Sequence, residues 1–301
     1  MISESLGDGL ILGTVQWGLP YGVANRTGQP DSRVVGEMMA VAEAAGVRTL
    51  DTARAYGSSE TVIGEHISDR VGWRVITKIQ PDLDPEDPDR AAVQLNESLA
   101  ASLGALGGAP DTVLLHRAAH RTAFGGRLWD QLLRAKDDGR TRRIGLSADT
   151  PEQALAALED PTVDVIQAAA SLLDPRLQRA GFFQRARDRG VEVHIRSVFL
   201  QGAACLAPEN LPPHLRALGP VLSTLGEIGG AMGCPVPELC LRYARDALGA
   251  AVVVGSETVA QLRENLRVLA TPRLPASTLA ELRAAVPDLP VPVLTPSSWP
   301  T

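Results

Sequence analysis

Four side chains of this sequence could together deliver a proton to a carbonyl oxygen: Asp51, Tyr56, Lys78 and His116. Lysine is scarce, since only Lys78 and Lys136 among the 29 basic residues are lysines, and Lys136 lies in a charged helix end that needs no further role. A tyrosine (pKa ~10) is a weak proton donor at neutral pH, and an adjacent ammonium favours the phenolate it leaves behind. An aspartate would hold that lysine, and a histidine would polarise the carbonyl. This set suits the addition of a hydride to carbon and a proton to oxygen.

Each of these residues also has a simpler interpretation. Lys78 could end a strand at the surface, Asp51 could cap a helix, His116 could be structural and Tyr56 could be an ordinary loop aromatic. Chance placement of all four at three successive strand ends is a much weaker explanation. A metal site fits less well, because His116 and His120 stand apart from the carboxylates in the sequence.

Short apolar runs alternate with amphipathic segments along the whole chain. The apolar runs predict strands at Leu10–Val15, Arg48–Asp51, Val75–Lys78, Thr112–His116, Ile144–Ser147, Val165–Ala168, Val191–Ser197 and Ala250–Val254. The amphipathic segments predict helices at Ser32–Ala45, Glu60–Ile67, Asp89–Leu103, Leu128–Asp138, Pro151–Leu158, Arg176–Arg189, Val236–Leu248 and Thr258–Leu269. Asp31 and Thr150 stand where helix caps are expected, and Gly46, Gly139 and Gly190 stand where helices should stop.

This alternation predicts an α/β protein, a single (β/α)8 TIM barrel. An open doubly wound sheet is the competitor, and the absence of G-x-G-x-x-G after an early strand disfavours it. We expect one domain over residues 1–301. Residues 271–301 form a C-terminal extension, expected to pack a helix around Leu279–Ala285 and then trail off. Barrel active sites form at the carboxyl ends of the strands, and polar residues stand at those ends here: Asp51, Lys78, His116, Ser147, Gln167, Arg196, Ser197, Gly255 and Ser256.

Composition excludes several other classes of protein. The 301 residues are 45% hydrophobic and 21% charged, which is ordinary for a globular protein. A net charge of −6 disfavours binding to nucleic acid or to an anionic membrane. No apolar run approaches the roughly 20 residues that span a bilayer, and Glu4 and Asp8 do not suit a secretion signal. Three cysteines without a paired pattern favour the cytoplasm.

The segment from Leu50 to Glu60, Leu-Asp-Thr-Ala-Arg-Ala-Tyr-Gly-Ser-Ser-Glu, resembles the signature of the aldo-keto reductase family. Further similar segments follow in the family's order along nearly the whole chain: Leu12-Gly13-Thr14, Thr77-Lys78, Leu114-Leu115-His116-Arg117, Arg143 to Ser147, Val165-Ile166-Gln167, and Val253 to Ser256 with Gln261 and Asn265. The segment Arg196 to Gly202 is similar to a bacterial branch of the family.

The resemblance implies that Asp51, Tyr56, Lys78 and His116 form a catalytic tetrad with Tyr56 as general acid. It implies an oxidoreductase that transfers a hydride from a nicotinamide cofactor to a ketone, aldehyde or imine of a small metabolite. Ser147 and Gln167 would hold the nicotinamide carboxamide. The remaining cofactor contacts would come from Arg196, Ser197, Leu200, Gly202, Gly255, Ser256, Gln261 and Asn265.

Two departures from the family pattern affect specificity. Ala170-Ser171 stands where a Tyr-Asn pair is usual, which suggests a roomier substrate pocket with Trp17 and Ser171 in its wall. No basic residue stands directly after the eighth strand, at Gly255-Ser256-Glu257, and Glu257 would repel a 2′-phosphate. Family members nevertheless slightly favour NADP(H) over NAD(H). Glu257 could also serve only the amino end of the following helix.

Two alternative functions share these residues. One is a redox-neutral biosynthetic enzyme on the same scaffold, and the other is a cofactor-sensing regulatory subunit. The complete tetrad favours an enzyme. We expect a small carbonyl compound as partner, and no nucleic acid, membrane or metal.

Overall fold

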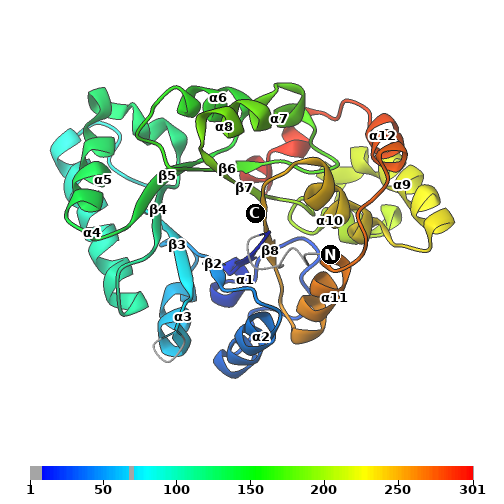
Figure 1. Ribbon diagram of the computed structural model, residues 1–301, viewed down its shortest axis with the longest axis horizontal. Coiled ribbons are helices and arrows are strands. Elements are labelled where there is room, and N and C mark those ends of the chain that lie inside the picture. The colour runs from blue at the N-terminus through cyan, green and yellow to red at the C-terminus, as the bar shows by residue number, and fades with distance from the viewer. Residues whose placement is uncertain (1–8, 68–70, 301) are drawn as a thin grey trace.

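The computed structural model describes residues 9–67 and 71–300, and its strands close into a barrel (Figure 1). All eight strands are parallel and pair in chain order, and the last pairs with the first through Leu12 and Val254. Their bounds are β1 Leu10–Gly13, β2 Thr49–Asp51, β3 Arg74–Lys78, β4 Thr112–Leu115, β5 Arg143–Ala148, β6 Val165–Ala169, β7 Glu192–Arg196 and β8 Ala251–Gly255. Each lies within two residues of its predicted bounds, so the (β/α)8 barrel prediction is confirmed. Glu4 and Asp8, which led us to expect no secretion signal, lie outside the described residues.

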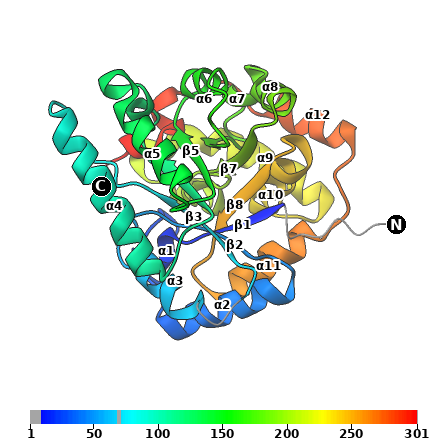
Figure 2. The ribbon, with the colours of Figure 1, turned by 60° about the vertical axis from the view of Figure 1, so that its left-hand side comes forward.

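Helices surround the barrel on its outer face (Figures 1 and 2). They are α1 Val15–Gly18, α2 Ser32–Ala44, α3 Ser59–Ile67, α4 Pro88–Leu106, α5 Arg127–Asp137, α6 Pro151–Leu158, α7 Arg176–Arg179, α8 Phe182–Arg189, α9 Gly219–Met232, α10 Val236–Ala247, α11 Val259–Leu269 and α12 Ala276–Ala285. The predicted caps are present, since Asp31 accepts a hydrogen bond from the Val34 N–H and Thr150 accepts one from the Gln153 N–H.

Alternation of side chains along each strand separates two cores. The outward side chains pack against the helices in one large cluster that includes Leu12, Leu50 and Val113. Inward side chains fill the barrel itself, where a second cluster consists of Ile11, Ile76, Leu114 and Val165. Because successive residues point to opposite faces, the inward register of β3 continues from Ile76 to Lys78 at the strand's carboxyl end.

Three segments differ from the predicted pattern. The predicted helix Arg176–Arg189 divides into α7 and α8 at Gly181, whose φ of +69° does not belong to a right-handed helix. Helix α9 was not predicted, because its four glycines weaken the helical pattern. The extension after residue 271 forms α12 and then two short 3₁₀ turns, Val291–Leu294 and Pro296–Ser298, so it does not trail off as expected.

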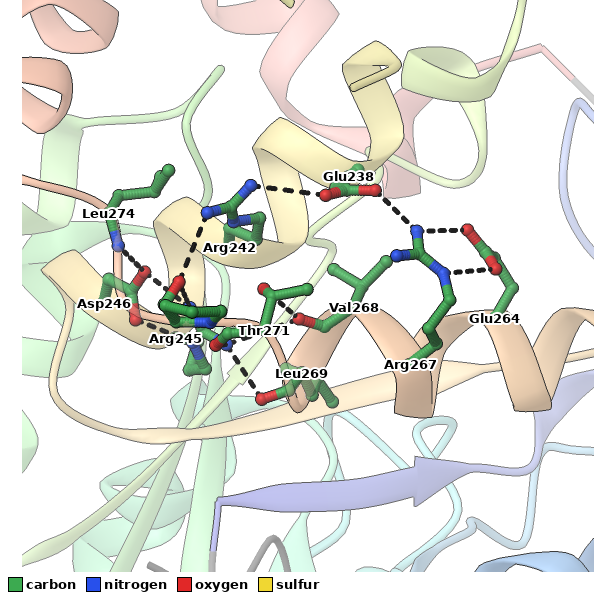
Figure 3. Close-up of polar contacts among 11 residues, drawn as sticks. Glu238, Arg242, Arg245, Asp246, Glu264, Arg267, Val268, Leu269, Thr271 and Leu274 are labelled. Atoms are coloured by element: carbon green, nitrogen blue, oxygen red, sulfur yellow. Dashed lines mark hydrogen bonds and ion pairs between the residues drawn. The ribbon is translucent and has the colours of Figure 1, made fainter. Parts of the chain in front are cut away.

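A network of arginines and carboxylates anchors α11 to α10 and to the extension (Figure 3). The Arg245 guanidinium pairs with Asp246 at 2.6 Å. It also donates to carbonyl groups at the end of α11 and beyond, those of Val268, Leu269 and Thr271. Arg267 bridges Glu238 on α10 and Glu264 on its own helix, at 2.7 Å in both cases. These bonds fix α11, whose first turns line the cavity described below.

Candidate active site

A cavity of about 1200 Å³ lies at the carboxyl ends of the strands. Its wall includes the strand-end residues Asp51, Lys78, His116, Ser147, Gln167 and Arg196. These side chains come from β2 to β7, which are far apart in the sequence and are brought together by the closure of the barrel. The cavity is therefore the place where the predicted acid–base residues meet.

The centre of the site is a buried ion pair between Lys78 and Asp51. The Lys78 ammonium lies 2.8 and 2.9 Å from the two carboxylate oxygens, and the two side chains are 1% and 4% exposed. Nζ also donates to the Thr52 carbonyl at 3.0 Å and lies 3.4 Å from the Tyr56 hydroxyl. Burial opposes the charged amine, but the Asp51 carboxylate and Tyr56 outweigh it and raise the pKa of Lys78. The lysine is thus a fixed cation beside a phenol.

His116 completes this group through an edge contact with Tyr56. The two rings meet edge to face, with their centroids 6.0 Å apart and their planes at 88°. Burial, followed by the positive charges of Lys78 and Arg196, lowers the pKa of His116 to about 3. Its Nδ1 is buried and has no hydrogen-bond partner among the described residues. At neutral pH the imidazole is uncharged and can act as a hydrogen-bond donor rather than a cation.

Two glycines hold the loop that carries Tyr56 against α1. Gly57 has a φ of +54°, and a Cβ on it would lie 2.3 Å from the Gly18 carbonyl oxygen. A Cβ on Gly18 would in turn lie 1.8 Å from the Tyr56 carbonyl oxygen. No residue with a side chain fits either position without moving this loop. The Tyr-Gly pair of the sequence motif is therefore a requirement of backbone packing.

Buried hydroxyl groups fix the same loop to the strands. Ser59 donates to Thr14 Oγ1 at 2.8 Å, and Thr52 donates to Ser59 Oγ at 3.0 Å. Thr14 then donates to the backbone carbonyl of Asp51 at 2.9 Å. All three hydroxyl side chains are fully buried. These bonds explain why Thr and Ser accompany the acid–base residues in the motif from Leu50 to Glu60.

Glu60, the last residue of that motif, ties the Tyr56 loop to β3. Its carboxylate is 2% exposed, pairs with Arg54 and accepts a hydrogen bond from Thr77 Oγ1 at 2.5 Å. Thr77 directly precedes Lys78, so this bond restrains the strand end that presents the ammonium. In the sequence, Glu60 stands out only as the last residue of the motif, and its contact with Thr77 could not be predicted from there.

Gln167 and Ser147 lie on neighbouring strands next to the ion pair. Gln167 Nε2 donates to Asp51 Oδ1 at 2.7 Å, and its Oε1 has no partner among the described residues. Ser147 Oγ accepts a hydrogen bond from Arg196 Nε at 3.3 Å, which leaves its own hydroxyl hydrogen to donate. Arg196 is held by an ion pair with Asp149. Gln167 thus offers a free acceptor, its Oε1, and Ser147 offers a donor, its hydroxyl hydrogen.

The segment after β7 has an unusual backbone and contacts the segment after α1. Ser197, Leu200 and Gln201 have φ values of +65°, +48° and +52°. Left-handed conformations of this kind in residues other than glycine are uncommon and cluster at functional sites. The Gln201 carbonyl accepts a hydrogen bond from the Val23 N–H at 2.9 Å. A Cβ on Gly202 would lie 2.9 Å from the Ala24 Cβ, so glycine permits this contact.

The end of β8 leads into α11 through a capping box. Thr258 accepts from the Gln261 N–H, and Gln261 Oε1 accepts from the backbone of Glu257 and Thr258 at 2.7 and 3.2 Å. The Glu257 carboxylate accepts from Gln261 Nε2 and from Thr27 Oγ1. Gln261 therefore serves the helix start as well as the cavity wall. A Cβ on Gly255 would collide with Gln16, whose Oε1 is also buried without a partner among the described residues.

Most of the predicted cofactor residues line the cavity: Ser147, Gln167, Arg196, Ser197, Gly202, Gly255, Gln261 and Asn265. Leu200 and Ser256 are buried and are not among the lining residues of the described chain, and the Ser256 hydroxyl instead accepts from Asn265 Nδ2 at 3.2 Å. The two predicted substrate-pocket residues are not lining residues either. Trp17 is buried in the large core cluster, and the Ser171 hydroxyl accepts from the Asp174 N–H.

Sequence reasoning missed other parts of the wall. Tyr21 lines the cavity, and burial together with the neighbouring Tyr56 raises its pKa to about 12. Leu294, Thr295 and Pro296 of the C-terminal extension also line it. The scarcity of tyrosine was a signal for Tyr21, but no local pattern predicts the return of the extension to the barrel.

The described part of the chain contains no group of three or more His, Cys, Asp or Glu residues arranged to hold a metal ion. Within the same residues, none of the helices has both the length and the apolar character that crossing a membrane requires.

The closed barrel of eight parallel strands with surrounding helices, and with polar side chains at the carboxyl ends of the strands, is a (β/α)8 TIM barrel. The family model of the aldo/keto reductase family matches residues 9–287, so the chain belongs to that family.

Solved structures agree in fold. An aldo-keto reductase from Bacillus halodurans, solved in its holo form, is 20% identical with a TM-score of 0.74, and the match covers 93% of this chain and 92% of that one. A Pseudomonas aeruginosa protein that carries the same family designation is 22% identical with a TM-score of 0.61, covering 87% and 89%. A search among curated proteins gives no match.

The residues of the cavity fit the nicotinamide cofactor that the family implies. The unpartnered Gln167 Oε1 and the Ser147 hydroxyl complement the N–H and C=O groups of a primary carboxamide. Gly202 and Gly255 keep the backbone open where a Cβ would meet Ala24 or Gln16. Loops after the seventh and eighth strands are the usual phosphate site of this barrel. A dinucleotide thus finds suitable partners at both ends of the cavity.

Proposed function

We propose that this protein reduces the C=O bond of a small ketone or aldehyde, or the C=N bond of an imine, with NADPH or NADH as reductant. The observation that carries the proposal is the contact of Lys78 with both Asp51, at 2.8 Å, and the Tyr56 hydroxyl, at 3.4 Å. When bound, the nicotinamide cofactor supplies the hydride for the carbonyl carbon. The residues of the chain supply the proton and the orientation.

Tyr56 donates its hydroxyl proton to the carbonyl oxygen of the substrate. The Lys78 ammonium stabilises the phenolate that remains, and Asp51 keeps this ammonium in place and charged. His116, uncharged because burial lowers its pKa, hydrogen-bonds the carbonyl oxygen and orients it toward Tyr56. Ser147 and Gln167 hold the carboxamide of the cofactor beside this group.

NADP(H) remains the favoured cofactor, because it is the usual cofactor of the family, although the Glu257 carboxylate would repel its 2′-phosphate at the adenosine end. The expected substrate is a small metabolite, and the C-terminal residues Leu294 to Pro296 give the cavity a wall that can select among carbonyl compounds. The cytoplasmic location stays a prediction.

The test compares two phenol variants in the same cavity. Tyr56→Phe and Tyr21→Phe each remove one hydroxyl and keep the ring, and both are assayed by oxidation of NADPH and NADH with a broad panel of carbonyl compounds. We expect Tyr56→Phe to bind cofactor normally and to lose about 10²–10⁴-fold in turnover, the usual contribution of a general acid. Tyr21→Phe should lose far less. Turnover that survives in Tyr56→Phe but is lost in Tyr21→Phe would transfer the acid role to Tyr21.

A further inference from the structure

The charges on the cavity wall are unequally paired. Four cationic side chains line it: Arg26, Lys78, Arg117 and Arg196. Three of them have a carboxylate partner, namely Lys78 with Asp51, Arg117 with Asp82 and Arg196 with Asp149. Arg26 is exposed, and among the described residues no carboxylate lies within ion-pair distance of it. Its charge is therefore available to an anion in the cavity.

The turn that carries Arg26 is held together by the side chain of Asn25. Asn25 Oδ1 accepts from the N–H groups of Thr27 and Gly28 at 3.0 and 2.8 Å, and its Nδ2 donates to the carbonyls of Gly28 and Tyr21 at 3.1 and 3.3 Å. Asparagine side chains that bond nearby backbone in this way stabilise a turn. Arg26 is placed by this turn, so ordering it around a ligand costs less entropy than ordering a free loop would.

The same turn is tied to the two loops expected to surround the phosphates. The Val23 N–H donates to the Gln201 carbonyl at 2.9 Å, in the segment after β7. Thr27 Oγ1 donates to Glu257 Oε2 at 3.3 Å, in the segment after β8. Arg26 lies one residue before Thr27 and is itself a lining residue. It thus stands between the loops where barrels of this class bind phosphate.

We propose that Arg26 binds a phosphate group of the dinucleotide cofactor. The inference rests on the proposed function for the identity of the ligand. An arginine binds phosphate oxygens through two parallel N–H donors, a geometry that suits this anion. Both cofactors carry a pyrophosphate, and NADPH adds a 2′-phosphate on the adenosine ribose. Arg26 supplies a cation that the residues directly after β8, Ser256 and Glu257, lack, and it does so from a segment near the other end of the chain.

The test measures binding rather than turnover. Arg26→Ala and Arg26→Lys are compared with wild type by calorimetric titration with NADPH, NADH and 2′,5′-ADP, which carries the 2′-phosphate and one 5′-phosphate but neither the pyrophosphate linkage nor the nicotinamide. Arg216→Ala is the matched control, because Arg216 is also an exposed arginine but does not line the cavity. We expect Arg26→Ala to weaken NADPH binding by roughly 10-fold or more, the usual effect of one hydrogen-bonded charge. Arg26→Lys should recover part of the loss, and Arg216→Ala should bind as wild type.

The three ligands separate the two phosphate sources. A loss confined to NADPH and 2′,5′-ADP assigns Arg26 to the 2′-phosphate, and an equal loss for NADH assigns it to the pyrophosphate; both outcomes support the proposal. Unchanged dissociation constants for all three ligands in Arg26→Ala overturn it, even if wild type reduces carbonyl compounds. Conversely, a wild-type protein that binds dinucleotides through Arg26 and reduces no carbonyl compound would refute the proposed function alone.

Discussion

Replacing Lys78 with methionine removes the central ammonium and keeps a side chain of similar length in the core. Removing one partner of a buried ion pair costs ~3–5 kcal/mol of unfolding free energy, because the other charge stays buried. Here the remaining Asp51 carboxylate keeps the hydrogen bond from Gln167 Nε2 at 2.7 Å. Because this bond remains, we expect the unfolding free energy to fall by about 3 kcal/mol, near the lower end of that range. A protein of ordinary stability, ~5–15 kcal/mol, remains folded after such a loss and can be assayed.

The chain offers a matched control in its other lysine. Lys136 Nζ lies 2.6 Å from an Asp164 carboxylate oxygen, a similar distance, but the two side chains are 34% and 29% exposed. Solvent screens such a pair, so Lys136→Met should cost about 1 kcal/mol or less. Chemical denaturation of both variants at the same pH measures the difference directly. We expect Lys78→Met to be the less stable by about 2 kcal/mol.

Turnover provides a second, independent readout of the same variant. Lys78→Met leaves the Tyr56 phenolate without its cation, so we expect turnover to fall by about 10²–10⁴-fold. The dissociation constant of the cofactor should change little, since Lys78 contacts Asp51, Thr52 and Tyr56 in the structure. Equal stability losses in the two lysine variants, or wild-type turnover in Lys78→Met, would refute the reasoning and leave Lys78 as a strand-end residue.

Two further predictions concern charge. Glu257→Arg should shift the relative affinity toward NADPH in a binding titration, because the carboxylate beside Thr27 would no longer repel a 2′-phosphate. Equal changes in the dissociation constants of NADPH and NADH would show that Glu257 only stabilises the start of α11. Because the pKa of His116 falls to about 3 in the folded protein, the unfolded chain binds its proton first, near pH ~6.5. Its contribution to stability is therefore complete above that pH and declines as pH falls toward 3. His116→Gln should give a shallower pH dependence of the unfolding free energy between these values, and identical curves would contradict the shift.

The period-two pattern of the strands explains how much of the site could be predicted. Side chains alternate across a strand, so the residues at the carboxyl ends of apolar runs could be read as inward-facing once a barrel was expected. Asp51, Lys78 and Gln167 lie on the cavity wall for this reason. Helix α9 could not be read in the same way, because glycine weakens the helical pattern, and the segment is stabilised by packing against α10 and α12.

Local patterning by itself therefore determined the barrel, the order of its strands and the polar residues at their ends. Only the tertiary structure decided the rest of the wall. Arg26 and Tyr21 lie on the cavity because the segment after α1 bonds to residues after β7 and β8, which no local pattern encodes. The Trp17 side chain packs in the core instead. Trp17 lies outside the strands, where side chains do not alternate regularly, so its direction depends on the neighbours it packs against. Long-range contacts of this kind have no period in the sequence.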